Sequence, residues 1–282
     1  MLTFLNILKK SLYLFFAVSL LMTGGINRVF TGDVYEYESV SSVIGLETLV
    51  RAQGVTTDGE SFIFSGKNAL ERTDLDGNEI LALNTRAIPG ELSEKYGAAH
   101  IGGISCADGK IYAPLEDSKI WEHPLIAVYD AATLEYTGVY YELPTSLLTR
   151  GVPWVICDAE NGFAYVGDSR NYTEIYKFNL SDFTYTETLT FDGEIKKIQG
   201  GEMYDGLIYF GTNDMTRAVY TFDPATGETA KLFDRITYEY TLIDNFGGEG
   251  EDLTVLPLPD GTYIHTLQLG ALFIDASLRH YK

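Results

Sequence analysis

The sequence predicts an all-β fold, a five-bladed β-propeller of four-stranded blades, and three observations lead to it. First, one outline recurs five times: a glycine-rich start, an apolar segment, a glycine-closed turn and a short aromatic-aliphatic strand. Second, the turn glycines are spaced by 50, 53, 44 and 55 residues, at Gly59, Gly109, Gly162, Gly206 and Gly261. Periods near 50 residues are typical of propellers. Third, 20 tyrosines and 28 glycines suit β-strands joined by tight turns.

Residues 1–26 resemble a targeting segment. Lys9 and Lys10 precede a 13-residue apolar run, residues 11–23. A basic start followed by 7–15 apolar residues is typical of a secretory signal, and the run is shorter than the roughly 20 residues that a spanning helix needs. No A-x-A cleavage site follows, so a cleaved signal peptide and an uncleaved signal anchor both stay open. Either one predicts an extracytoplasmic protein: secreted, periplasmic or membrane-anchored.

Residues 27–50 are predicted to form a linker plus a closing strand at 33–43. The propeller itself is expected to occupy residues 51–282. Its last blade lacks an outer strand, because only residues 278–282 follow the third one. We therefore expect the N-terminal strand to complete the last blade, since ring closure removes two unpaired sheet edges.

The four strands of each blade follow from short alternating segments. In the fourth repeat, residues 199–204 are the expected inner strand and 207–211 the second strand. The other copies of the outline are residues 52–65, 100–114, 152–166 and 247–266, with second strands expected at 61–65, 110–114, 162–166 and 262–269. The third strands are expected to end in Asp or Asn before a small-residue turn, at Asp74, Asp130, Asn179, Asp223 and Asp275. Such side chains bond backbone two residues ahead, so we interpret them as turn residues. The long connection 84–99 is expected to contain a helical turn at 91–96.

The composition excludes some partners. Forty acidic against 20 basic residues give a net charge of −20, which disfavours nucleic acid and anionic lipid. Solubility outside the cell and cation binding both remain explanations of the acidity. Two cysteines, Cys106 and Cys157, do not make a disulfide framework and are expected to be buried free thiols. Three histidines are interpreted as ordinary strand or surface residues: His123, His265 and His280.

The predicted functional site is the mouth of the central channel, where the inner strands begin. The residues expected to bind a ligand there are Gln53, His100, Trp154, Gln199 and Glu202, with Asp158 nearby. The acid-rich run at 247–252 supplies the expected metal ligands, Glu249, Glu251 and Asp252, and carboxylate oxygens suit Ca²⁺. Three interpretations stay open: a mouth that only holds ordered water, a bound cation or small ligand, or catalysis by an acid–base pair such as Glu202 and Glu251.

The third strands, with their apolar-x-apolar-Asp-x-x-Thr-Gly pattern (VYTFDPATGE, VYDAATLE), resemble those of bacterial YVTN-type and quinoprotein-like propellers over about residues 51–277. The resemblance implies the fold but no single function, because such propellers include scaffolds, lactonases, phytase-like phosphatases and glycosidases. We expect an extracytoplasmic binding or scaffold protein whose channel mouth recognises a small molecule, a glycan or a surface protein. The alternative is a Ca²⁺-dependent hydrolase of a phosphoester, lactone or glycan.

Overall fold

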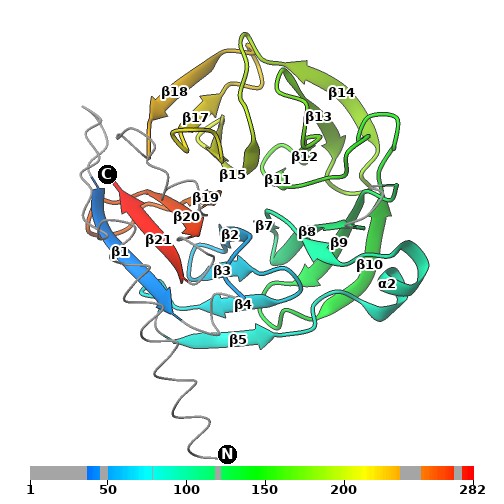
Figure 1. Cartoon of the computed structure of the whole chain (residues 1–282), viewed down its shortest axis with the longest axis horizontal. Helices are drawn as coiled ribbons and strands as arrows, with labels where there is room; N and C mark the ends of the chain where they lie inside the picture. The colour runs from blue at the N-terminus through cyan, green and yellow to red at the C-terminus, as the bar shows by residue number, and fades with distance from the viewer. Residues whose placement is uncertain (1–36, 45–49, 78, 118–121, 236–248, 270–274) are drawn as a thin grey trace, which may run out of the picture.

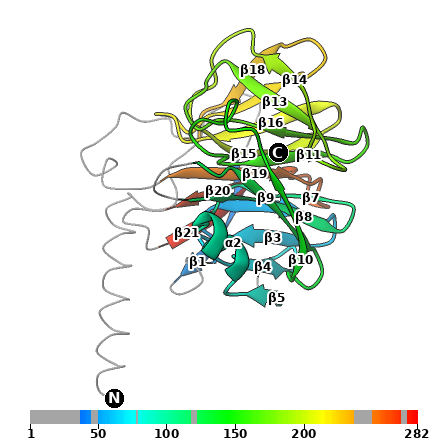
Figure 2. The same ribbon diagram turned by 90° about the vertical axis from the view of Figure 1, so that its right-hand side faces the viewer.

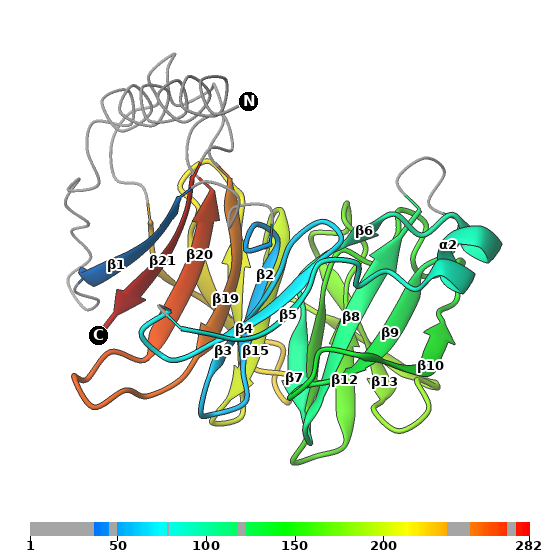
Figure 3. The same cartoon turned by 90° about the horizontal axis from the view of Figure 1, so that it is seen from below.

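Five antiparallel sheets stand in a ring around a central axis (Figure 1). The computed structural model describes residues 37–44, 50–77, 79–117, 122–235, 249–269 and 275–282. The ring confirms the predicted all-β fold, a five-bladed β-propeller. The helix α2 (Gly90–Tyr96) lies in the connection between blades 1 and 2, where the sequence predicted a helical turn. Figures 1 and 3 place it at the outer edge of blade 2.

The blades follow one another along the chain, each running from the axis outward. Blade 1 consists of β2 (Gly54–Thr57), β3 (Phe62–Ser65), β4 (Leu70–Thr73) and β5 (Ile80–Asn84). Blade 2 consists of β6 (His100–Ile101), β7 (Ser105–Ala107), β8 (Lys110–Glu116), β9 (Leu125–Asp130) and β10 (Tyr136–Glu142). Blade 3 consists of β11 (Val155–Asp158), β12 (Phe163–Val166), β13 (Glu174–Asn179) and β14 (Tyr185–Thr190). Blade 4 consists of β15 (Ile198–Tyr204), β16 (Leu207–Thr212), β17 (Val219–Phe222) and β18 (Thr229–Phe233).

Blade 5 joins the two ends of the chain. From the axis outward it consists of β19 (Gly250–Val255), β20 (Ile264–Leu269), β21 (Asp275–Tyr281) and the N-terminal strand β1 (Tyr37–Ile44). β1 pairs antiparallel with β21, from Tyr37 opposite Tyr281 to Ile44 opposite Asp275, and the two strands lie side by side in Figure 2. The predicted closure of the ring by the N-terminal strand is therefore confirmed.

The two faces of the ring differ in their connections. We call the face where the inner strands begin the entry face, and the opposite one the turn face. Each repeated glycine lies on the turn face, in the connection between the first two strands of its blade, and all five adopt positive φ, from +71° to +90°. Glycine adopts this conformation without the steric cost of a Cβ atom. In the described ranges, the interblade linkers and the connections between second and third strands lie on the entry face.

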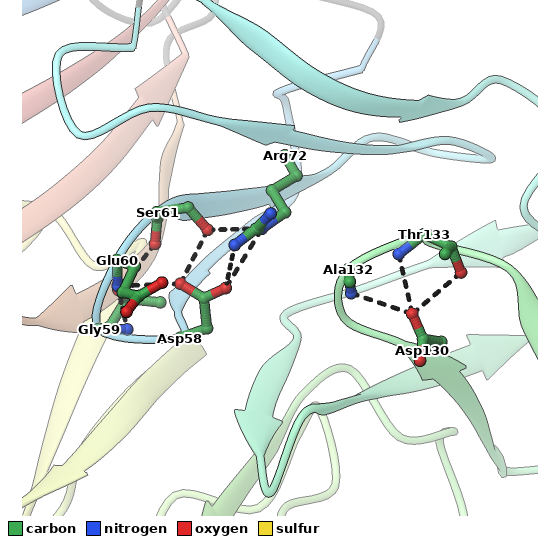
Figure 4. A network of polar contacts seen from close by, with 9 residues as sticks. Asp58, Gly59, Glu60, Ser61, Arg72, Asp130, Ala132 and Thr133 are labelled. Atoms are coloured by element: carbon green, nitrogen blue, oxygen red, sulfur yellow. Dashed lines mark hydrogen bonds and ion pairs between the residues drawn. The ribbon is translucent and has the colours of Figure 1, made fainter.

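Aspartates organise many of the tight turns on the turn face. Asp130 Oδ1, at the end of β9, accepts hydrogen bonds from the backbone N–H groups of Ala132 and Thr133 and from the Thr133 hydroxyl (Figure 4). In the β2–β3 turn, Asp58 accepts from the Glu60 N–H and the Ser61 hydroxyl and pairs with Arg72 (Figure 4). The turn role predicted for the third-strand aspartates is thus confirmed at Asp130.

One member of that predicted series is placed differently. Asp275 begins β21 instead of ending a third strand, so it lies on the entry face. The third strand of blade 5 therefore continues to Tyr281, beyond its predicted end at Asp275. It pairs with β20 from Leu269 opposite Ala276 to Ile264 opposite Tyr281. The register is set by this pairing, which a short apolar segment does not specify on its own.

The hydrophobic core is divided into wedges between blades. Five clusters of buried residues occur in the described part of the chain, and each draws on two neighbouring blades. Blades 5 and 1, for example, share a cluster in which Phe62 and Phe64 meet Leu267 and Leu278. Because every blade face is covered by the next blade, stability depends on an intact ring.

Candidate functional site

The mouth on the entry face is surrounded by residues that immediately precede or open the inner strands. Gln53, His100, Gln199 and Glu249 occupy such positions in blades 1, 2, 4 and 5, and all four are partly exposed. The topology thus brings these four predicted residues to one rim. Their binding roles remain predictions.

A hydrogen-bonded chain crosses the junction between blades 1 and 2 on this rim. His100 Nε2 donates to Gln53 Oε1 at 2.6 Å, and His100 Nδ1 lies 3.4 Å from Glu116 Oε2. The Gln53 amide is oriented by its own donation to the carbonyl of Ala52 at 2.6 Å. His100 faces Glu116 across the β6–β8 pair, and its side chain is 27% exposed.

Glu116 is the functional candidate that the sequence interpretation missed. Its side chain is 8% exposed, yet its Oε1 atom has no hydrogen-bond partner among the described residues. Buried polar atoms in folded proteins are nearly always hydrogen-bonded, so an unpaired carboxylate oxygen indicates a place for a donor. Glu116 ends an apolar strand, and the sequence alone does not show that its register partner is His100.

Asp252 lies at the axis beneath the rim. Its side chain is fully buried; Oδ2 accepts from the Val55 N–H at 3.2 Å and Oδ1 from the Leu253 N–H at 2.8 Å. A Cβ atom at Gly200 would overlap the carboxylate, which explains the glycine at this position of β15. Burial raises the pKa of Asp252 well above its ordinary value, while backbone N–H groups, including that of Ile104, favour the ionised form.

Glu202 lies further along the inner strands. Its Oε2 accepts hydrogen bonds from Thr56 Oγ1 at 3.1 Å and Thr254 Oγ1 at 3.0 Å, so it links blade 4 to blades 1 and 5. Burial raises the pKa of Glu202 to about 8, although both hydroxyl donors oppose the shift. Thr56 Oγ1 in turn accepts from the Cys106 N–H at 3.0 Å. These axial polar groups connect inner strands to one another.

The three predicted metal ligands do not converge. The Asp252 carboxylate lies at the axis, where it accepts a hydrogen bond from the Val55 N–H. Glu251, the preceding residue on the strand, has Arg235 and Glu249 as its charged neighbours. Burial raises the pKa of Glu251 well above its ordinary value, Glu249 adds to the rise, and Arg235 opposes it. Successive strand residues point to opposite faces. Within the described ranges, no group of three His, Cys, Asp or Glu side chains is placed to hold a metal ion. Ca²⁺ binding and the hydrolase alternative remain predictions.

Two other predicted site residues, Trp154 and Asp158, have structural roles. Trp154 is 2% exposed and packs edge-to-face on Phe210 with ring centroids 5.6 Å apart, in the wedge between blades 3 and 4. Asp158 lies at the far end of β11, where its Oδ1 accepts from the Asn161 N–H at 3.1 Å. Asp158 therefore organises a turn on the turn face, away from the mouth.

The two cysteines are free, as the sequence predicted. Burial raises the pKa of the Cys106 thiol to about 12 and that of the Cys157 thiol well above its ordinary value. Thiols held protonated in this way are poor nucleophiles. The cysteines therefore contribute to packing around the axis.

His265 and His280, which the sequence interpretation treated as ordinary, form a buried pair in blade 5. Their Nδ1 atoms are 2.7 Å apart, and His265 Nε2 donates to the Leu256 carbonyl at 2.8 Å. His265 Nδ1 is therefore the acceptor and His280 Nδ1 the donor. Burial lowers the pKa of His265 to about 4 and also lowers the pKa of His280. Both rings are accordingly neutral at pH 7.

Comparisons with known proteins leave the family of this chain open. No family model matches it, and no curated protein matches it. Among solved structures, hydrazine synthase from Kuenenia stuttgartiensis is similar, with a TM-score of 0.42 and 13% identity over 76% of this chain and 55% of the other. The chain thus spans about half the length of that neighbour. The propeller assignment stands on the five sheets themselves.

The described residues include no helix with the length and apolar character of a membrane span. The predicted targeting segment, residues 1–26, lies outside the described residues, as do residues 236–248 of the connection between blades 4 and 5.

Proposed function

We propose that this protein is an extracytoplasmic binding and scaffold protein whose axial mouth takes a cationic group, an amine or guanidinium, of its partner. The observation that carries the proposal is the buried Glu116 Oε1 atom, which has no hydrogen-bond partner among the described residues and belongs to the same carboxylate that contacts the partly exposed His100. An N–H donor from a ligand would complete its hydrogen bonding.

The charge of the protein supports a cationic ligand. The net charge of −20 attracts cations over long distances and repels anions. At the mouth, Glu249 adds a partly exposed carboxylate. An aromatic platform for a sugar is not supplied by Trp154, because that ring is buried. The proposed export rests on the basic and apolar pattern of residues 9–23.

We also propose membership in the YVTN-type and quinoprotein-like propellers. The pattern of the third strands supports it, since Asp130 and Asp223 both accept hydrogen bonds from the backbone two residues ahead in the turn that follows.

The test is a calorimetric titration with a hexalysine peptide. We expect Glu116→Gln to weaken binding at least tenfold, because the amide removes the charge and replaces a carboxylate oxygen with a donor. Glu135→Gln is the matched control: it changes the net charge equally and lies in the same blade, but on the turn face, and it should bind within twofold of wild type.

His100→Ala should also weaken binding, because it removes the ring that contacts the Glu116 carboxylate. Equal affinities for wild type, Glu116→Gln and Glu135→Gln would show that hexalysine binds only through the overall charge, and would overturn the proposed site. Circular dichroism of each variant establishes that it is folded.

A further inference from the structure

A polar pocket on the entry face lies away from the axis, in blade 3. It is formed by the linker that precedes β11 and by the connection between β12 and β13, and it has a volume of about 440 Å³. Arg150 enters it from the first segment and Arg170 from the second, with Ser146, Asn171 and Tyr176 among the other lining residues. Two arginines in one pocket are notable in a chain with twice as many acidic as basic residues.

Neither guanidinium group has a partner among the residues that the structure describes. Arg150 and Arg170 are both exposed, and neither side chain takes part in a hydrogen bond or ion pair with the described residues. Arg72 and Arg51, by contrast, form ion pairs with Asp58 and Glu71. The pocket therefore offers donors and positive charge that the protein itself does not use.

Asp168 fixes the position of both arginines. Its Oδ2 accepts from the Arg150 N–H at 2.9 Å and from Thr149 Oγ1 at 3.0 Å, and its Oδ1 accepts from the Arg170 N–H at 3.0 Å. The Asp168 side chain is buried, and both of its oxygens accept these hydrogen bonds. Ser169 Oγ adds a bond to the Arg150 carbonyl at 3.1 Å. One carboxylate thus joins the two segments and holds the two arginine backbones together.

Glu174, the other acidic residue beside the pocket, already accepts hydrogen bonds from the protein. Glu174 Oε1 accepts from Asn171 Nδ2 at 2.8 Å and from the Tyr176 hydroxyl at 3.0 Å. After these bonds are counted, what remains open to a ligand is the pair of guanidinium groups and the Ser146 hydroxyl. All of them donate hydrogen bonds, so the complementary ligand group accepts them and carries negative charge.

We propose that this pocket binds an oxyanion group, a carboxylate or a phosphoryl group, of a small organic molecule. Guanidinium matches both groups, because its planar array of N–H donors forms paired hydrogen bonds with two oxygens. The volume exceeds that of a bare ion and lies in the range of small-molecule sites. The pocket is independent of the axial mouth, which is proposed to take a cation.

Three pyranoses that differ at one carbon test the proposal: glucuronate, glucose 6-phosphate and glucose, each titrated up to 10 mM and followed by NMR or calorimetry. We expect at least one of the two anionic sugars to bind wild type, and glucose to bind at least tenfold more weakly. The tighter anionic sugar identifies the preferred group. Binding should weaken as salt is added, since exposed charges are screened.

The decisive variant is Arg150→Gln/Arg170→Gln, which should weaken binding of the anionic sugar at least tenfold. Lys67→Gln/Arg86→Gln is the matched control, because it removes two positive charges from exposed residues of the same face in blade 1. It should bind within twofold of wild type. Equal weakening in both double variants, equal affinity for glucose, or no binding of either anionic sugar would overturn the proposal.

The hexalysine titration separates the two proposed sites. Arg150→Gln/Arg170→Gln should retain the tenfold difference in hexalysine affinity that Glu116→Gln produces, and Glu116→Gln should leave sugar binding unchanged. Failure of one site is then distinguishable from failure of the other, and retained hexalysine binding also establishes that the arginine variant is folded.

Discussion

At the scale of single residues, the axis depends on acidic side chains held away from water. Glu202 receives two threonine hydroxyls, and burial raises its pKa to about 8 from an ordinary 4.5. Below pH 4.5 the carboxyl is protonated in both the folded and the unfolded chain, and its contribution to stability is fully present. Between pH 4.5 and 8 only the unfolded chain loses the proton, so the fold loses stability as the pH rises.

Glu202→Gln should therefore stabilise the protein at high pH. A glutamine is neutral throughout, and each pKa unit corresponds to about 1.4 kcal/mol, so the wild-type loss between pH 4.5 and 8 is on the order of 5 kcal/mol. Thermal melts at pH 5, 7 and 9 should show the melting temperature of the variant rising relative to wild type as the pH increases. Parallel pH profiles for the two proteins would mean that Glu202 titrates normally.

Glu228→Gln is the control for that experiment. Glu228 is exposed on the turn face, and the same chemical change there should leave the pH profile of the melting temperature unaltered.

The sequence could identify polar residues near the axis but could not assign their surroundings. Gln53 and His100 precede or open inner strands, so their place at the rim followed from the repeat. Trp154 holds the corresponding position in blade 3 and is buried, because blade 4 presents Phe210 against it. Glu116 lies on a second strand, and only the β6–β8 register brings it to His100. Which residues lie opposite each other in a sheet depends on strand register, and the repeat pattern in the sequence does not specify that register.

At the scale of the elements, Arg235 joins blades 4 and 5 on the entry face. It follows β18 and is fully buried, and its guanidinium donates to the carbonyls of Thr212 at 2.6 Å, Leu267 at 3.2 Å and Arg217. Burial lowers the pKa of Arg235 to about 10, which leaves it charged at pH 7. Leu267 belongs to β20 in blade 5, whereas the other two carbonyls belong to blade 4.

Arg235→Met should destabilise the protein by about 3 kcal/mol or more. The substitution leaves three buried carbonyls without a donor, and hydrogen bonds to charged groups contribute about 1.5–3 kcal/mol each. Urea unfolding of the purified variant measures the loss. Lys231→Met is the matched control on β18: Lys231 forms an exposed ion pair with Asp234, and such pairs contribute about 0–1 kcal/mol. Equal losses in the two variants would mean that the Arg235 hydrogen bonds between blades 4 and 5 do not stabilise the fold.

The elements were predictable where a local rule sets them. The turn glycines with positive φ and Asp130, at the end of β9, follow such rules, and they were predicted correctly. The position of Asp275 was predicted wrongly, because the residues around it match the short pattern of the true turn aspartates although it begins β21. The inner strand of blade 2 is also divided, into β6 and β7, since Gly103 leaves the sheet to bond the Pro153 carbonyl at 2.9 Å in the next blade. This contact joins two neighbouring blades, so the sequence pattern of a single blade does not predict it.

At the scale of the whole molecule, the ring is closed by non-covalent strand pairing. β1 forms the outer edge of blade 5: one of its edges pairs with β21, and the other pairs with no strand in the part of the chain that the structure describes. Five core wedges depend on every blade having two neighbours. Weakening the closure should therefore lower the stability of the entire domain, and a single cooperative transition is expected.

Two adjacent proline variants of the full chain test this closure, Val40→Pro and Ser41→Pro. Successive N–H groups of an edge strand point alternately toward its partner and toward solvent, and proline has no N–H. One variant should lower the melting temperature by about 2–5 °C, as expected for the loss of roughly one ladder hydrogen bond, while the other should remain within about 1 °C. If neither variant changes the melting temperature, β1 does not close the ring.

The sequence by itself determined the architecture of this protein. Its glycine spacing set five blades, its alternation set the strands, and the missing outer strand assigned the closing role to the N-terminal segment. All of these follow from short-range rules repeated along the chain. Only the tertiary structure decided which side chains meet: Glu116 with His100, Asp252 with the N–H groups of another blade, and Arg150 with Arg170 across one pocket. These contacts depend on how the blades pack and how their strands pair. Residues far apart in the sequence carry no local signal of such contacts.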